Sequence, residues 1–190
     1  MYEGLTKIFW GIFFATFNLN LGPVKILPAF VGFMLISSGL NTIYLEHKDE
    51  EWKKALELSR VAVAVSLLGW VIDFFIFGTY TSSIIILLLP ILLMVVELLM
   101  FYNFFRGLVK YFHSIGNIEV SESLIGSSRL YLIIFIINTA ILSFTQLFNW
   151  EGINTLLAII FIILRISVMV IISGLKKQLI PFNPDKNQGL

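Results

Sequence analysis

The sequence predicts an all-α integral membrane protein in which six transmembrane helices form one bundle over residues 1–190. Of the 190 residues, 58% are hydrophobic and 13% are charged, whereas a soluble domain carries about 25% charged residues. The apolar residues come in blocks long enough to cross a bilayer. A net charge of +1 gives no basic field for nucleic acid, and the lack of cysteine excludes thiolate chemistry and cysteine-bound metals.

Charged and turn-forming residues bound six predicted spans, namely residues 5–21, 26–45, 61–79, 82–105, 130–150 and 155–175. The first is the weakest, because its apolar run, IFWGIFFATF, is short and is followed by Asn18 and Asn20. It either crosses the membrane or enters and turns back. Lys7 before this run is also typical of a signal peptide, but the run lacks an A-x-A-like cleavage site, so we expect a retained segment.

Prolines and glycines organise the entry into the second span. Gly22 and Pro23 predict an outer turn, and Pro28 suits the first turn of a helix, where its missing N–H does little harm. Gly32 and Gly39 are seven residues apart and so share one helix face. We therefore expect this face to pack closely against the first span.

The loop before the third span predicts a cytosolic helix that begins near Asp49. Asp49 precedes Lys53 by four residues, and Glu50 precedes Lys54 by the same interval, which is the favourable order for helical ion pairs. This helix, which includes Trp52, is either a docking surface for a partner or a solvated extension of the span, and general experience with mixed-charge faces favours the extension.

The loop after the fourth span predicts an interfacial segment. Leu108, Phe112 and Ile115 recur at helical spacing, so this segment is expected to lie in the plane of the interface with its apolar face in lipid. Gly116 and the serine-rich stretch after it predict a loop up to residue 130. Within the fourth span, Pro90 predicts a kink.

The basic residues predict that both termini are cytoplasmic. If all six segments cross, eleven of the thirteen Lys and Arg residues fall on one side, and the opposite connections hold only Lys25. Such asymmetry follows the positive-inside rule. The eleven residues are Lys7, Lys48, Lys53, Lys54, Arg60, Arg106, Lys110, Arg129, Lys176, Lys177 and Lys186.

Three ionisable residues, Asp73, Glu97 and Arg165, fall inside the spans. Each costs about 2.5–3.5 kcal/mol at mid-bilayer on insertion scales and is a functional candidate by default. At about 1.5 Å per residue from the nearest inner flanking charge, they lie about 20, 14 and 17 Å deep. Arg165 therefore lies at a depth between the two acids and can neutralise one of them. We predict that Glu97 is the surplus, protonated acid, because its own helix offers no close polar companion.

Uncharged polar residues extend this intramembrane cluster. Asn138 is expected at the depth of Glu97, and four further side chains are candidate secondary lining, namely Asn18, Asn20, Ser143 and Gln146. Two interpretations stay open. The cluster is either a polar cavity that binds a solute or relays protons, or a nearly neutral structural group that determines which helices pack together.

The run FNLNLGPVKILPAFVGFMLISSGL resembles the opening of a group of uncharacterised small multi-pass membrane proteins of Gram-positive bacteria. In that group a phrase like LPDFIGYxLIxxGL follows a short first hydrophobic segment. The resemblance covers about the first 45 residues, and Ala29 stands where the group usually has an acid. It implies a location in the bacterial inner cell membrane and no particular activity.

Two functions are consistent with these features. The first is binding or transport of a small solute at the intramembrane cluster. The second is that of a non-catalytic membrane partner, such as an immunity, regulatory or assembly protein, which acts through the cytosolic helix and the interfacial segment. An enzyme is not expected, because the sequence has no G-x-S-x-G or H-E-x-x-H motif and no nucleotide fingerprint. No metal or cofactor is predicted, and the expected partners are the lipid bilayer and a solute or membrane protein.

Overall fold

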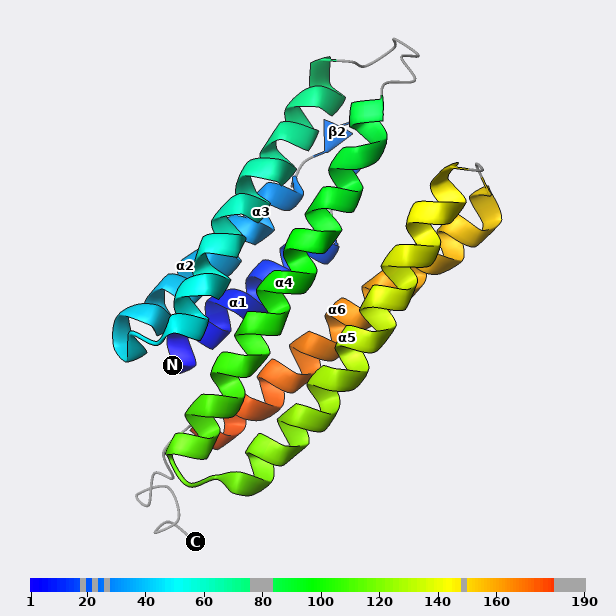
Figure 1. The fold of residues 1–190 in the computed structure, drawn as a ribbon. Coiled ribbons are helices and arrows are strands. Elements are labelled where there is room, and N and C mark those ends of the chain that lie inside the picture. Colours follow the sequence, from blue (N-terminus) through cyan, green and yellow to red (C-terminus); the bar gives the residue numbers. More distant parts are fainter. Residues whose placement is uncertain (18–19, 22–23, 26–27, 76–83, 148–149, 180–190) are drawn as a thin grey trace, which may run out of the picture.

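The computed structural model is an all-α bundle with one short hairpin (Figure 1). It describes residues 1–17, 20–21, 24–25, 28–75, 84–147 and 150–179. The helices alternate in direction, and the two-residue strands β1 (Asn20–Leu21) and β2 (Val24–Lys25) pair antiparallel between the first two helices. The helices are α1 (Tyr2–Thr16), α2 (Ala29–His47), α3 (Glu50–Phe75), α4 (Ile84–Ser114), α5 (Ile118–Leu147) and α6 (Glu151–Leu179).

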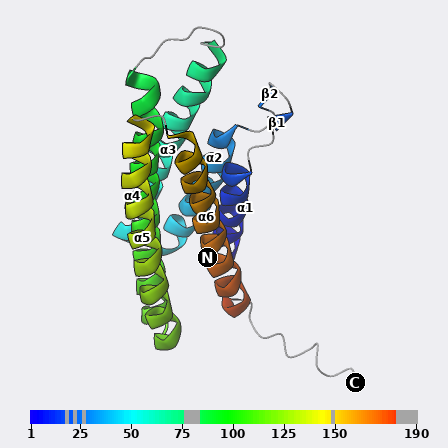
Figure 2. The same ribbon diagram turned by 90° about the vertical axis from the view of Figure 1, so that its right-hand side faces the viewer.

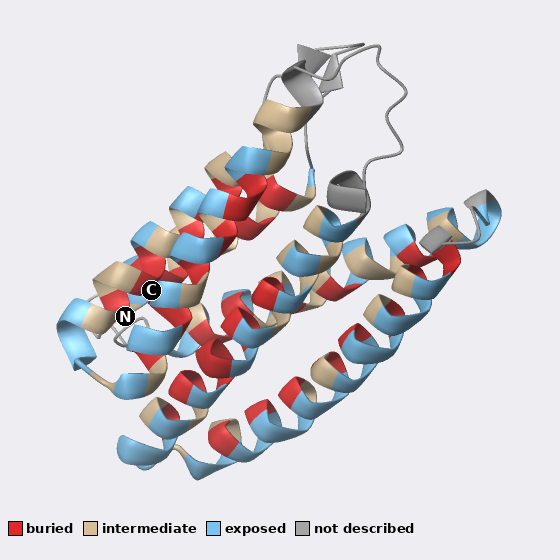
Figure 3. Ribbon diagram, turned by 45° about the horizontal axis from the view of Figure 1, so that its top comes forward, coloured by how far each residue is buried: buried red, intermediate tan, exposed pale blue. Residues whose placement is uncertain are grey.

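The six helices form a closed ring in which each packs against two neighbours. In ring order they are α1, α2, α3, α4, α5 and α6, and α6 packs again on α1. Figure 2 shows α6 beside α1. Buried residues lie mainly on the sides of the helices that face one another (Figure 3). The outer faces of α5 and α6 are apolar, with Leu130 62% and Val170 66% exposed, as expected of helices whose solvent is lipid.

Five helices, α2 to α6, are long and apolar enough to span a membrane. This agrees with a polytopic membrane protein. The first predicted span, residues 5–21, is wrong at its end, because α1 stops at Thr16, before a segment rich in the turn-forming residues Asn, Gly and Pro. At 15 residues, α1 is about 22 Å long, shorter than the roughly 30 Å hydrocarbon layer. A sixth crossing therefore stays a prediction.

The connection between α4 and α5 is shorter than predicted. The predictions of an interfacial segment and of a serine-rich loop are both wrong, because α4 runs on to Ser114 and α5 begins at Ile118. Leu108 and Phe112 are 0% and 1% exposed and belong to the bundle core. At the turn, Gly116 has a φ of 79°, and the Asn117 Oδ1 accepts a hydrogen bond from the Val120 N–H at 3.3 Å. This cap starts α5 early.

Close glycine contacts join α1 and α2, as predicted for Gly32 and Gly39. A Cβ atom on Gly11 would lie 2.7 Å from the Gly32 carbonyl oxygen, and one on Gly4 would lie 2.8 Å from the Gly39 carbonyl oxygen. Each helix thus places a glycine against the backbone of the other at two levels. The two backbones can approach this closely only because no side chain separates them.

The N-terminus, the α2–α3 and α4–α5 connections and the end of α6 lie together at one end of the bundle (Figure 1). We call it the basic end because it holds Lys48 of the α2–α3 connection and basic residues of the adjoining helix ends, namely Lys53, Lys54, Lys110, Lys176 and Lys177. The Met1 ammonium pairs there with Glu46. That the basic end lies on the cytoplasmic side stays a prediction. The identity of the membrane as the bacterial inner cell membrane also stays a prediction.

The start of α3 is clamped to α4 at this basic end. As predicted, the helix starts beside Asp49, whose Oδ1 accepts a hydrogen bond from the Glu51 N–H at 3.1 Å. Asp49 pairs with Lys110 of α4 rather than with its predicted helical partner. Glu51 pairs with Arg106 at 3.1 Å. The acids of this helix therefore serve the packing within the chain.

Trp52 is part of the core and not of a docking surface. It is 2% exposed, and a Cβ atom on Gly107 would lie 2.8 Å from its ring. Its ring centroid lies 5.9 Å from that of Phe104, edge to face. The predicted partner surface on the cytosolic helix therefore lacks its aromatic residue.

We expect Gly32→Ala to destabilise the protein by about 1–3 kcal/mol, because its methyl group would overlap the Gly11 carbonyl and push α1 from α2. Thermal unfolding in detergent micelles, followed by circular dichroism, measures this loss. The matched control is Gly126→Ala within α5, where a Cβ meets nothing within 4 Å. It should stabilise the helix by about 0.5–1 kcal/mol. Equal effects of the two substitutions would contradict the close α1–α2 contact.

The Asp49–Lys110 pair predicts an acid-dependent loss of stability. The hydrogen bond from Lys110 lowers the pKa of Asp49, and burial opposes this shift only in part. The pair therefore contributes its full stabilisation above the ordinary Asp pKa of about 4 and loses it as the pH falls through the lower folded value. Unfolding midpoints between pH 7 and pH 3 should decline less in Asp49→Asn than in the wild type. Parallel curves would exclude this pair as a source of the decline.

Candidate functional site

An ion pair crosses the interior of the helix ring and joins α4 to α6. The Arg165 Nε lies 2.8 Å from the Glu97 Oε1, and the Arg165 Nη2 lies 2.6 Å from the Glu97 Oε2. Both carboxylate oxygens thus accept from one guanidinium, which is the strong two-pronged geometry. The Glu97 side chain is 4% exposed and that of Arg165 is 20% exposed. Since the backbones of α4 and α6 are not neighbours in the ring, these long side chains reach across the space between the two helices.

The same guanidinium also binds the end of α1. The Arg165 Nη1 donates to the Ala15 carbonyl oxygen at 3.0 Å. Ala15 lies in the last turn of α1, where helix carbonyls lack partners within the helix and the helix dipole is negative. Arg165 therefore neutralises Glu97 and caps α1 at once, and three elements meet at one charged side chain.

The prediction that Glu97 is the surplus, protonated acid is wrong in this geometry. Each of its two oxygens accepts a hydrogen bond from the guanidinium, which is the arrangement of an ionised carboxylate. The prediction rested on the lack of a polar residue close to Glu97 on its own helix. The companion of Glu97 comes from a helix 68 residues further along the chain.

The predicted cluster is brought together only in part. Asn138 of α5 is 3% exposed and donates through its Nδ2 to the Leu157 carbonyl of α6 at 3.1 Å. Leu157 precedes Arg165 by eight residues, or about 12 Å along the helix. Asn138 therefore joins α5 to α6 at another level than the ion pair, and its Oδ1 has no hydrogen-bond partner.

The remaining predicted residues do not extend the described cluster. The Ser143 hydroxyl donates to the Thr139 carbonyl of its own helix at 2.8 Å. Asp73 belongs to α3, Asn20 to β1 and Gln146 to α5, but their side chains lie outside the described residues, as does the whole of Asn18. Their roles in the cluster stay predictions.

Tyr131 of α5 is the residue that sequence reasoning missed. It is 3% exposed, and its ring packs against Phe101 and Phe105 of α4 at centroid distances of 5.8 and 5.5 Å. Its hydroxyl lies within electrostatic range of Glu97 and Arg165 and has no hydrogen-bond partner among the described residues. A tyrosine one residue after the predicted start of a span is typical of the membrane interface. The extension of α5 to Ile118 moves it into the interior.

The arrangement offers hydrogen bonds rather than metal ligands. No group of three or more His, Asp or Glu side chains that could hold a metal ion occurs within the described ranges. Within the described ranges, the buried hydrogen-bonding atoms without a partner are the Glu51 Oε2 at the basic end and, on α5, the Tyr131 hydroxyl, the Asn138 Oδ1 and the Thr139 Oγ1. Leaving such an atom unsatisfied costs about 1–3 kcal/mol. We call the three α5 residues, which are spread over about 12 Å of the helix, the polar strip. Their unpaired atoms can accept or donate hydrogen bonds.

We expect Glu97→Gln or Arg165→Met alone to destabilise the protein by about 3–5 kcal/mol, because each leaves an uncompensated charge in a low-dielectric interior. The double variant should lose much less than the sum of the two. Unfolding in mixed micelles measures this coupling. The control is Arg106→Gln, which breaks the pair with Glu51 at a guanidinium that is 55% exposed and should lose at most about 1 kcal/mol. Additive losses at Glu97 and Arg165 would contradict the pair.

No match to a known protein indicates a role for the site, so its own geometry carries the interpretation. No protein-family model, curated protein or solved structure matches the chain. The resemblance of the N-terminal run to small membrane proteins of Gram-positive bacteria accordingly stays a prediction. The described residues form a bundle of apolar helices, compatible with a polytopic membrane protein, that holds the buried Glu97–Arg165 ion pair in its interior.

Proposed function

We propose that this multi-pass membrane protein binds a small polar solute along α5, between the level of the Glu97–Arg165 pair and that of Asn138, and carries it across the bilayer. The observation that supports the proposal is the polar strip of α5, in which the Tyr131 hydroxyl, the Asn138 Oδ1 and the Thr139 Oγ1 are buried without partners. Buried polar atoms in proteins are nearly always hydrogen-bonded. A bound solute that satisfies them explains why they are tolerated.

The charge balance at the pair narrows the solute class. Glu97 and Arg165 neutralise one another, and the third guanidinium nitrogen is occupied by the Ala15 carbonyl. The site therefore offers no unpaired charge to an ionic solute. Two amphoteric hydroxyls and one carbonyl acceptor suit a small neutral molecule that carries hydroxyl or amide groups.

The alternative, a non-catalytic membrane partner, has less support. Its predicted anchor, Trp52, lies in the core, and the acids beside it pair with α4. What remains is the exposed charged side of α3, which includes Lys53, Lys54 and Glu57. Solvated charges of this kind need no partner.

The proposal is tested by measuring solute retention and thermal stability in the wild type and in a triple variant. Tyr131→Phe, Asn138→Leu and Thr139→Val together remove the three unpaired atoms and nearly preserve volume. Native mass spectrometry of the protein released gently from lipid should show a small-molecule adduct on the wild type and none on the triple variant. The solute-free variant should unfold at a temperature close to that of the wild type, because the gain from removing the unsatisfied atoms is offset by the loss of the Asn138–Leu157 hydrogen bond.

The matched control is Ser143→Ala, also on α5, whose hydroxyl is already bonded to its own helix. This variant should keep the adduct. An adduct that survives the triple substitution would overturn the proposal. So would wild-type protein that carries no adduct and is less stable than the triple variant, because the strip would then be an unoccupied defect.

A further inference from the structure

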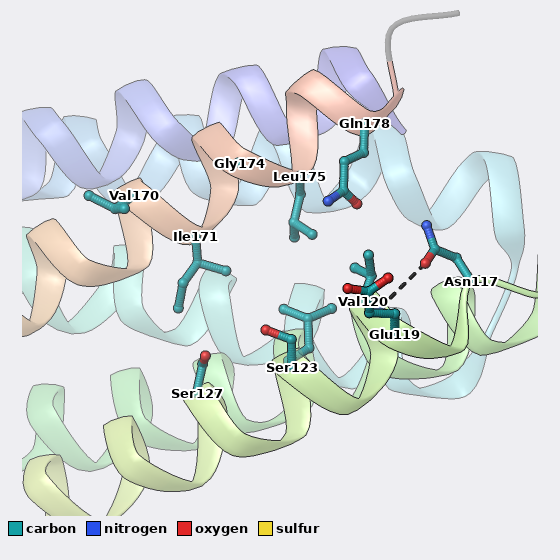
Figure 4. A pocket seen from close by; sticks show the side chains of 11 residues that line it. Asn117, Glu119, Val120, Ser123, Ser127, Val170, Ile171, Gly174, Leu175 and Gln178 are labelled. Carbon is teal, nitrogen blue, oxygen red and sulfur yellow. Dashed lines mark hydrogen bonds between the residues drawn. The ribbon is translucent and has the colours of Figure 1, made fainter.

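A groove between α5 and α6 at the basic end forms a second site, remote from the ion pair. Its volume is about 420 Å³, within the range of about 300–1,000 Å³ that is usual for small-molecule sites. One wall is the first three turns of α5 and the other is the last three turns of α6 (Figure 4). Glu119 is the charged residue that lines it.

The polarity of the groove changes along its length. Asn117, Glu119 and Gln178 lie together at the basic end (Figure 4). Away from that end the walls carry the apolar residues Leu124, Val170 and Ile171, with the small residues Ser123, Ser127 and Gly174 between them. Ser127 follows Glu119 by eight residues, or about 12 Å along α5. A ligand that fills the groove therefore needs a polar head at the basic end and an apolar part that points toward the bundle centre.

The residues around the groove indicate that its ligand comes from the membrane rather than from water. The groove opens toward exposed apolar residues of both helices, among them Ile125 beside it at 37% and Val170 in its wall at 66% exposure, which suits contact with lipid. A membrane lipid has the same polarity gradient, with its headgroup at the interface and its acyl chains inside. The groove has this gradient along the bundle axis, with its polar end at the end of the helices.

The negative charge of Glu119 at the polar end of the groove favours a lipid headgroup that carries a positive charge. The Glu119 carboxylate has no salt-bridge partner within the described ranges. On α6, the Lys176 ammonium lies over the rings of Tyr2 and Phe9 of α1, at 5.0 and 5.8 Å from their centroids, and Lys176 does not line the groove. A primary ammonium can donate three hydrogen bonds to the acceptors at this end. We propose that the groove binds a membrane phospholipid with a primary-ammonium headgroup, which pairs with Glu119.

The test uses the full chain in nanodiscs that contain equal amounts of phosphatidylethanolamine, phosphatidylcholine and phosphatidylglycerol. Native mass spectrometry should show phosphatidylethanolamine adducts in excess over phosphatidylcholine, whose quaternary ammonium cannot donate hydrogen bonds. Glu119→Gln should lower this excess about tenfold, as expected for a lost charge-assisted hydrogen bond. The matched control, Glu122→Gln, changes an exposed acid on the next turn of α5 that does not line the groove, and should keep the excess.

Other occupants would give other results. An equal excess in the wild type and in Glu119→Gln would overturn the proposal, as would a groove occupied by a second copy of the chain, seen as a dimer without lipid. Displacement of the lipid by water-soluble glycerophosphoethanolamine would show that the headgroup alone binds and would overturn the membrane source. Since no residue of the polar strip takes part, failure here leaves the solute proposal standing, and failure of the solute proposal leaves this one standing.

Discussion

The Glu97–Arg165 pair is the constraint on which the arrangement of the helices depends. A charge inside a membrane protein must meet an opposite charge or water, because isolated ions are poorly tolerated in a low-dielectric medium. Here the two charges come from helices whose backbones are not neighbours. They can meet only if the intervening helix α5 holds α4 and α6 at the right separation and if both side chains point into the ring. The pair thus selects one helix order among many.

The first hairpin adapts to this pair. Glycines bring α1 against α2 with backbone in contact, so a helix too short to cross the hydrocarbon by itself can still be held in the bundle. Its last turn then ends at Arg165. An arginine serves here because its planar fork can bind a carboxylate with two nitrogens and a carbonyl with the third. A lysine at this position has a single nitrogen and could not place separate donors opposite both carboxylate oxygens and the carbonyl oxygen.

Packing is uneven around the ring, and both proposed sites follow from this. The α3–α4 side is filled by large rings such as Trp52 and Phe104 and is tied by ion pairs at its basic end. On the α5–α6 side, serines on α5 and Gly174 on α6 leave a groove at the basic end. Further along α5, the interior face carries polar atoms that no neighbouring side chain reaches. Ligand-sized space and unmet hydrogen bonds thus occur where the helices pack least tightly.

The helices, the apolar outer faces, the Gly32 and Gly39 contact and the presence of an arginine at the depth of an acid could be predicted from the amino-acid sequence. These follow from local composition, periodicity and the rise of a helix, which need no knowledge of neighbours. The packing of the folded chain was needed to show that Glu97 is the partner of Arg165, that Tyr131 lies inside, that Trp52 is core and that the serine-rich stretch is helical. Each of these depends on which helix lies opposite, and facing partners are set by long-range packing that no local pattern encodes.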